Sequence, residues 1–122
     1  MHALRQIHRA LVPGGLLVDM HPIPPSTRIE VDGVSLGELD DAEFMTLVEE
    51  TEAPLMETDL FSLEEEVEFD WLERFDSGDE LIEAVSSWEW TQVPPDVAER
   101  ARAVEGPVDI WERVVLRRYR AV

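Results

Sequence analysis

The chain contains no cysteine and no lysine. The absence of cysteine excludes disulfide scaffolds, thiolate zinc sites and cysteine nucleophiles. The absence of lysine leaves 10 arginines against 28 acidic residues and a formal net charge of −18. Because a protein that binds nucleic acid needs a net basic surface to displace counterions, we do not expect nucleic acid among its partners.

Long apolar runs are also missing. No segment reaches the roughly 18 consecutive apolar residues of a membrane span, and a polar helix is predicted at the start, where a secretory signal would be apolar. We therefore expect no membrane insertion, no secretion and a cytoplasmic location. With 122 residues, of which 44% are hydrophobic, the chain is predicted to form one domain over residues 1–122.

The charges are distributed unevenly along the chain. Acidic residues cluster between positions 38 and 89, and the last segment carries Arg113, Arg117, Arg118 and Arg120. The two regions are predicted to attract each other, within one chain or between chains. The acidic region is interpreted as a solvated surface with ordinary ion pairs. The alternatives are tolerance of acid or salt, and an acidic protein-interaction domain that docks a basic partner.

The first residues predict a helix, a turn and a strand. Residues 2–11 carry apolar side chains at helical spacing, Pro13 prevents the helix from continuing, and Gly14 and Gly15 permit a sharp reversal. The next segment, LLVDM, starts with an unbroken apolar run. Such a run is typical of a strand that is covered on both faces.

A proline-rich segment is predicted to end this strand at Pro22, Pro24 and Pro25. The segment RIEVDGVSL then alternates apolar and polar residues around Asp32 and Gly33. An Asp-Gly pair tolerates the positive φ angles of a two-residue turn, so this segment predicts a β-hairpin.

The middle of the chain predicts a helix and a strand. Asp40 and Glu43 form a capping-box pattern for a helix that is expected to end before Pro54. Residues 65–75 fit both a helical and an alternating pattern. Their β-branched and aromatic content favours a strand.

The last third predicts two helices and a strand. Ser77 and Glu80 form a clear capping box for the helix DELIEAVSSW. A second short helix is predicted from Pro95 to about Val104, because proline suits the first helical position. The final segment, VDIWERVVLRRYRAV, is apolar or aromatic on both alternating faces, which predicts a long strand well inside a sheet.

The stretch ALRQIHRALVPGGLLVDMHP resembles the helix, turn and fifth strand of class I S-adenosylmethionine-dependent methyltransferases. The residues that match the family pattern are Arg9, Leu11, Pro13, Gly14 and Gly15, with Ala10 in place of the usual valine. Less specifically, FDSGDELIEAVSSW and the final strand resemble the last helix and the final antiparallel strands of that family. The Pro13-Gly14-Gly15 turn is a structural feature and indicates fold rather than catalysis.

The resemblance implies an α+β fold for the isolated chain: a fragment similar to the C-terminal part of a Rossmann-like methyltransferase α/β sheet, with an inserted hairpin. The family holds its cofactor with a Gly-rich loop after the first strand and an acid after the second. This chain has no room for either. No cofactor-binding residue is therefore carried over, and the chain by itself is expected to bind no S-adenosylmethionine.

Two explanations of this missing half remain open. Met1 is either an internal methionine, with the cofactor-binding half encoded upstream, or the start of a free-standing remnant. An uncovered sheet edge promotes aggregation, so a remnant that folds is expected to form a homodimer or to be completed by another protein chain.

Two residues after the predicted turn are candidates for chemistry. Asp19 and His21 are expected at the carboxyl end of the strand, the edge where open α/β sheets bind ligands. His21 is a candidate for substrate contact or for a base near neutral pH, and Asp19 is a weaker catalytic candidate. The favoured interpretation of His21 is structural. Asp19 is expected to pair with an arginine or a backbone donor.

The remaining candidates for a site are interpreted as structural. The four tryptophans are expected to pack in the core, the alternative being an aromatic pocket; they are Trp71, Trp88, Trp90 and Trp111. No metal site is predicted, because His2 and His8 do not share a helix face and the acidic pairs lack the spacing of a calcium loop.

These observations support one hypothesis of function and one main alternative. The first is a methyltransferase-like fragment without its own cofactor site, acting as an oligomeric or partner-binding module with no activity alone. The alternative is a methyltransferase of an unknown small molecule, whose cofactor-binding half is missing from this chain or supplied by another. In that case His21 and the hairpin would line the substrate pocket.

Overall fold

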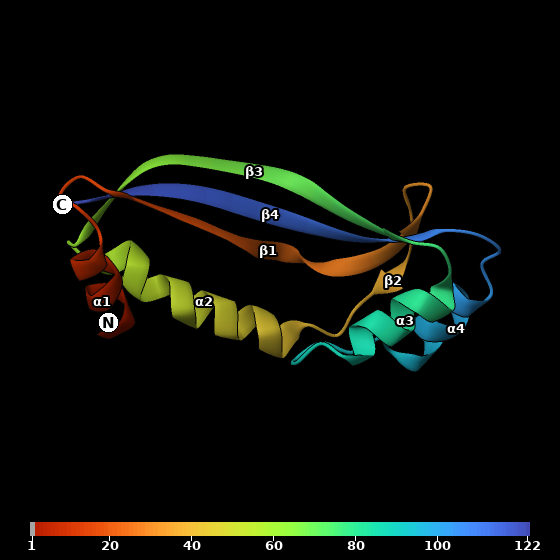
Figure 1. Ribbon diagram of the computed structural model, residues 1–122. Coiled ribbons are helices and arrows are strands. Elements are labelled where there is room, and N and C mark those ends of the chain that lie inside the picture. Colours follow the sequence, from red (N-terminus) through yellow and green to blue (C-terminus); the bar gives the residue numbers. More distant parts are fainter. Residues whose placement is uncertain (1) are drawn as a thin grey trace.

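The computed structural model describes residues 2–122, apart from the side chain of His2, so the expectation about Met1 lies outside the described residues. Over residues 2–122 the fold is α+β, with four helices and a four-stranded antiparallel sheet. The elements in chain order are α1 (His2–Ala10), β1 (Leu16–Val31), β2 (Val34–Glu38), α2 (Ala42–Glu57), β3 (Phe61–Phe75), α3 (Gly78–Ser86), α4 (Pro95–Arg102) and β4 (Val108–Ala121). Helices α1 and α2 lie along one half of the sheet, and α3 and α4 gather at its other end (Figure 1).

The strand order in the sheet is β2-β1-β4-β3, and every neighbouring pair is antiparallel. The last strand, β4, therefore lies between β1 and β3, which confirms the prediction that it runs well inside the sheet. The prediction of a strand over residues 65–75 is also confirmed, although β3 begins earlier, at Phe61.

The predicted hairpin is present between β1 and β2. Val31 pairs with Val34 across a two-residue turn, and both turn residues have positive φ, 50° at Asp32 and 81° at Gly33. These angles match the type I′ turn that suits the right-handed twist of paired strands.

The prediction that prolines end the first strand is wrong. β1 continues through Pro22, Pro24 and Pro25 as far as Val31. The pairing of β1 with β4 shifts its register between Ile23 and Arg28, so the proline segment forms an irregularity within the strand. Prolines are tolerated here because a proline needs no ladder partner at a sheet edge or bulge.

The helix α2 also differs from its prediction at both ends. Asp41, rather than Asp40, precedes its first residue, and the Asp41 carboxylate accepts a hydrogen bond from the backbone N–H of Thr27, 3.0 Å away, instead of capping the helix. The helix continues past Pro54 to Glu57. Leu55, in the turn after the proline, is buried, so its packing outweighs the hydrogen bond that the proline removes.

The two later helices agree with their predictions. The Ser77 hydroxyl accepts a hydrogen bond from the backbone N–H of Glu80, 3.2 Å away, as the capping box requires. Helix α4 begins at Pro95 and ends at Arg102, close to the predicted limit. Within residues 2–122 no helix is long and apolar enough to cross a membrane.

The core is divided between the two ends of the sheet. One cluster joins β1 and β4 to α3 and α4, and its members include Ile29, Leu81, Val97 and Ile110. The other lies under α1 and α2, and its buried members are Leu55, Phe61, Tyr119 and Ala121. Between them, α2 runs beside the first half of β1, where the candidate site lies (Figure 1).

The prediction that the LLVDM strand is covered on both faces is wrong. Burial alternates along it: Leu17 and Asp19 are partly buried, whereas Val18 is 58% exposed and Met20 is 51% exposed. One face of this half of the sheet is therefore open. The alternation is that of an antiparallel sheet with one covered face.

Candidate functional site

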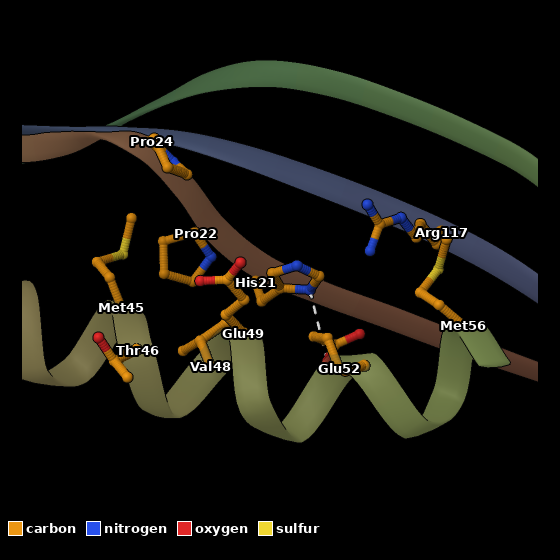
Figure 2. Close-up of a pocket in the computed structure, with 11 residues that line it drawn as sticks. His21, Pro22, Pro24, Met45, Thr46, Val48, Glu49, Glu52, Met56 and Arg117 are labelled. Atoms are coloured by element: carbon orange, nitrogen blue, oxygen red, sulfur yellow. Dashed lines mark ion pairs between the residues drawn. The ribbon is translucent and has the colours of Figure 1, made fainter.

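Asp19 and His21 share the face of β1 that is turned toward α2, because residues two apart in a strand point the same way. Figure 2 shows His21 and Pro22 on β1 and Glu52 on α2, with Arg117 reaching in from β4. The expectation that Asp19 and His21 end a strand is wrong, since β1 continues for ten residues beyond His21, to Val31. They lie instead within β1, where it forms an edge of the sheet beside α2.

Asp19, His21 and Glu52 form a compact cluster. The His21 Nδ1 atom is 2.8 Å from Asp19 Oδ2 and 3.6 Å from Glu52 Oε1. One ligand atom from each of the three residues lies within 4.8 Å of the other two. Asp19 was expected to pair with an arginine or a backbone donor, and its partner is instead His21.

The surroundings of Glu52 favour its protonated form. Its side chain is 15% exposed. Burial raises the pKa of the Glu52 carboxyl to about 7, helped by the hydrogen bond and the negative charge of Asp19, while the positive charge of Arg117 opposes this rise. Arg117 is itself engaged with Glu66 on β3, at 2.7 Å. The cluster therefore holds two acids and one histidine around a shared, poorly solvated space.

Two hollows adjoin the cluster. The first, of about 350 Å³, lies between α2 and the sheet; besides His21 and Glu52 it is lined by Met45, Val48, Met56 and Arg117, among others (Figure 2). The second, of about 430 Å³, lies along β1 and is lined by all three cluster residues together with Met20, Phe44, Leu47, Val48, Thr51 and Trp90. The second hollow is thus a groove lined both by apolar side chains and by the acidic residues Asp19 and Glu52, and we call it the β1–α2 groove.

The groove runs along a free edge of β1. On the side away from β4, β2 pairs only with Arg28–Val31, and no strand in the described part of the chain pairs with residues 16–23. The backbone N–H of Ala121 donates to the carbonyl of Gly15, at 2.8 Å, which places residues 15, 17, 19 and 21 in the hydrogen-bonded pairs with β4. In an antiparallel pair the intervening residues point their N–H and C=O groups the other way. The backbone groups of Leu16, Val18 and Met20 therefore face the open edge.

The opposite edge of the sheet is protected in a different way. β3 carries five acidic residues between positions 64 and 70, namely Glu64, Glu65, Glu66, Glu68 and Asp70. All five form ion pairs with arginines of β4, so the predicted attraction between the acidic region and the last segment is confirmed within one chain. Charged side chains are a common means of preventing edge-to-edge pairing, and in the unpaired stretch of β1, residues 16–23, the ionisable side chains are Asp19 and His21, which face α2.

The tryptophans do not form the predicted core. Only Trp111 is buried, where the guanidinium carbon of Arg28 lies 3.8 Å from the centre of its ring. Trp71, Trp88 and Trp90 are exposed. Trp90 lines the β1–α2 groove, and Trp71 lies on the open face of the sheet with Met20 and Val114.

The Pro13-Gly14-Gly15 turn lies at the far end of β1 from this cluster. It joins α1 to β1, with Gly14 at a φ of 76° and the N–H of Gly15 bonded to the carbonyl of Val12 at 2.8 Å. A side chain would strain the backbone at Gly14, so the motif has a structural explanation. None of its residues lines the hollows beside Glu52.

Sequence reasoning selected His21 and Asp19 but missed Glu52. The two residues were selected because they were expected at the carboxyl end of a strand; the signal that was not used is their Asp-x-His spacing, which places both side chains on one face of β1. Glu52 comes from a helix, and no local pattern connects it with β1. No protein-family model, curated protein or solved structure matches the chain.

Proposed function

We propose that this chain is a partner-binding module that takes up an extended segment of another protein along the free edge of β1. The observation that carries the proposal is the unpaired stretch of β1, residues 16–23, beside the β1–α2 groove. An added strand would bond to the outward N–H and C=O groups of Leu16, Val18 and Met20. This is the known mode of β-strand addition, in which backbone bonds give affinity and side-chain pockets give specificity.

The composition of the groove indicates the chemistry of the partner. Its lining includes the acids Asp19 and Glu52 and the apolar side chains of Phe44, Leu47 and Trp90. The whole chain carries a net charge of −18. A basic segment with alternating apolar residues complements both features, whereas a second acidic copy of this chain would be repelled from the groove.

A displayed library of short peptides, selected against the full chain, tests this proposal. We expect the selected peptides to be rich in arginine or lysine and in β-branched or aromatic residues. Met20→Pro removes one outward N–H and is expected to weaken binding of a selected peptide at least tenfold, whereas Met20→Ala keeps the N–H and is the matched control. Peptides that bind both variants equally, or a selection without binders, would contradict strand addition.

A second candidate function follows from the resemblance to methyltransferases. The free edge belongs to the strand that follows Pro13-Gly14-Gly15, and a cofactor-binding half on another polypeptide would require such an edge to continue the sheet. In this alternative the chain is the C-terminal part of a Rossmann-like methyltransferase sheet, with the β1–β2 hairpin inserted. Calorimetric titration of S-adenosylmethionine into the chain alone is expected to give no binding; micromolar binding would instead favour an enzyme complete in itself.

A further inference from the structure

We infer that Asp19, His21 and Glu52 bind a divalent transition-metal ion such as Zn²⁺ or Mn²⁺. This inference goes beyond partner binding and does not depend on it. The three side chains come from two elements, β1 and α2, and their ligand atoms lie within 4.8 Å of one another. The sequence analysis predicts no metal site, because it considered only His2, His8 and neighbouring acidic pairs, and Glu52 lies far from His21 in the chain.

The distances are close to those that a metal requires. Zinc bonds to nitrogen and oxygen of about 2.0–2.2 Å place neighbouring ligand atoms about 3.4 Å apart in a tetrahedral site. The His21 Nδ1 atom lies 2.8 Å from Asp19 Oδ2 and 3.6 Å from Glu52 Oε1, one distance slightly below that value and one slightly above. The third pair of ligand atoms, one each from Asp19 and Glu52, lies within 4.8 Å, so a bound ion would draw the two carboxylates together.

Burial supports the same inference. The three side chains are between 11% and 21% exposed. The Glu52 Oε2 atom is buried and has no hydrogen-bond partner among the described residues. Buried carboxylate oxygens are normally bonded or coordinated, so this unpartnered oxygen is free to coordinate an ion. The nearest cation, Arg117, is already bonded to Glu66.

The ligand types select the class of metal. Imidazole nitrogen with carboxylate oxygen suits zinc, manganese and iron better than calcium or magnesium, which prefer oxygen alone. Three protein ligands leave at least one coordination position open. That position would face the hollow of about 350 Å³ between α2 and the sheet, which has room for water or a small anionic ligand (Figure 2).

Titration of the chelator-treated full chain with Zn²⁺ and with Co²⁺ tests the inference by calorimetry and by the visible absorption of cobalt. We expect one ion per chain with micromolar or tighter affinity, and a cobalt spectrum that reports nitrogen ligation. His21→Ala and Glu52→Gln are expected to weaken binding more than tenfold. Glu49→Gln, on the same helix and in the wall of the same hollow, is the matched control and is expected to bind like the original chain.

The controls distinguish specific metal binding at Asp19, His21 and Glu52 from nonspecific binding to the many acidic side chains of the surface. Circular dichroism verifies that each variant is folded, and Asp19→Asn provides an independent test if His21→Ala does not fold. Equal zinc affinity in Glu49→Gln and Glu52→Gln would show binding to surface acids and overturn the inference. So would the absence of any zinc or cobalt binding by the original chain.

Discussion

At the scale of single residues, carboxylates placed close together dominate the chemistry of this chain. Glu112, on β4, resembles Glu52 in this respect. Burial raises the pKa of the Glu112 carboxyl above its usual range, and the negative charges of Glu73 and Asp41 raise it further. Ionised Glu112 therefore destabilises the folded state.

The sign of this effect gives a prediction for Glu112→Gln. Below the ordinary pKa of glutamic acid, Glu112 is protonated in both the folded and the unfolded state. At such a pH it does not change the free energy of unfolding. Above the raised pKa of Glu112 in the folded state, the carboxyl is ionised in both states, and the full cost of holding that charge in the folded protein lowers its stability. The substitution is thus expected to raise Tm at pH 7 and to leave Tm nearly unchanged at about pH 3.5.

Thermal unfolding followed by circular dichroism at the two pH values measures this difference. Glu68→Gln provides a control, because Glu68 is exposed and faces Arg113 rather than other acids. A gain in Tm of equal size at both pH values would show that packing, and not ionisation, is responsible.

At the residue scale, the sequence singled out Asp19 and His21 but not their contact. The two residues lie two apart on one strand and are 2.8 Å apart, whereas Asp19 was expected to pair with an arginine or a backbone donor. Glu52 was missed because its contact with His21 depends on how α2 lies beside β1, and this tertiary placement leaves no periodic trace in the sequence. Asp41 is a second example of a tertiary contact that local sequence does not predict, because its carboxylate accepts a hydrogen bond from the N–H of Thr27 instead of capping its helix.

At the scale of secondary structure, turn and first-position signals were more reliable than prolines taken as stop signals. The hairpin turn at Asp32 and Gly33 and the start of α4 at Pro95 follow from backbone preferences that act within a few residues. The prolines of β1 and Pro54 of α2 were misread as stops. In both cases tertiary contacts allow the element to continue. The prolines of β1 lie in an irregular part of the strand at a sheet edge, and the turn after Pro54 is held by the buried Leu55.

The capping box of α3 provides a quantitative test of these local signals. Ser77→Ala removes the acceptor for the N–H of Glu80, so we expect a loss of about 1 kcal/mol in the free energy of unfolding. Urea unfolding measures this loss. Ser86→Ala is the matched control, because the Ser86 hydroxyl bonds only to the carbonyl of Glu83 within the same helix. Similar effects of the two substitutions would mean that the cap does not stabilise α3.

At the scale of the whole molecule, the open face of the sheet is the main unexplained surface. The strand register aligns apolar side chains of three strands on it; they include Val18, Met20, Val67, Trp71 and Leu116. Exposed apolar patches of this kind mark interfaces. Arg118 lies toward one end of the face and Glu112 toward the other, so a two-fold pairing of two copies would bring opposite charges together.

The homodimer expected from the sequence therefore remains a prediction, with this face as its interface. Because two chains of net charge −18 repel each other, we expect dimerisation to strengthen as salt is added. Val67→Arg, on β3 and away from the free edge of β1, is expected to keep the chain monomeric. Sedimentation velocity at low and high salt gives the masses, with the exposed Val34→Arg as control. A dimer that persists in Val67→Arg would place the interface elsewhere.

Amide hydrogen exchange along β1 in the isolated chain tests most directly whether the edge of this strand is free to pair with a partner. The N–H groups of Val18 and Met20 are turned to the free edge, whereas those of Leu17 and Asp19 are bonded to β4. We expect fast exchange at Val18 and Met20, slow exchange at Leu17 and Asp19, and protection of Val18 and Met20 only when a partner segment is bound. Equal protection of all four amides in the isolated chain would show that the edge is already occupied and would contradict the proposed function.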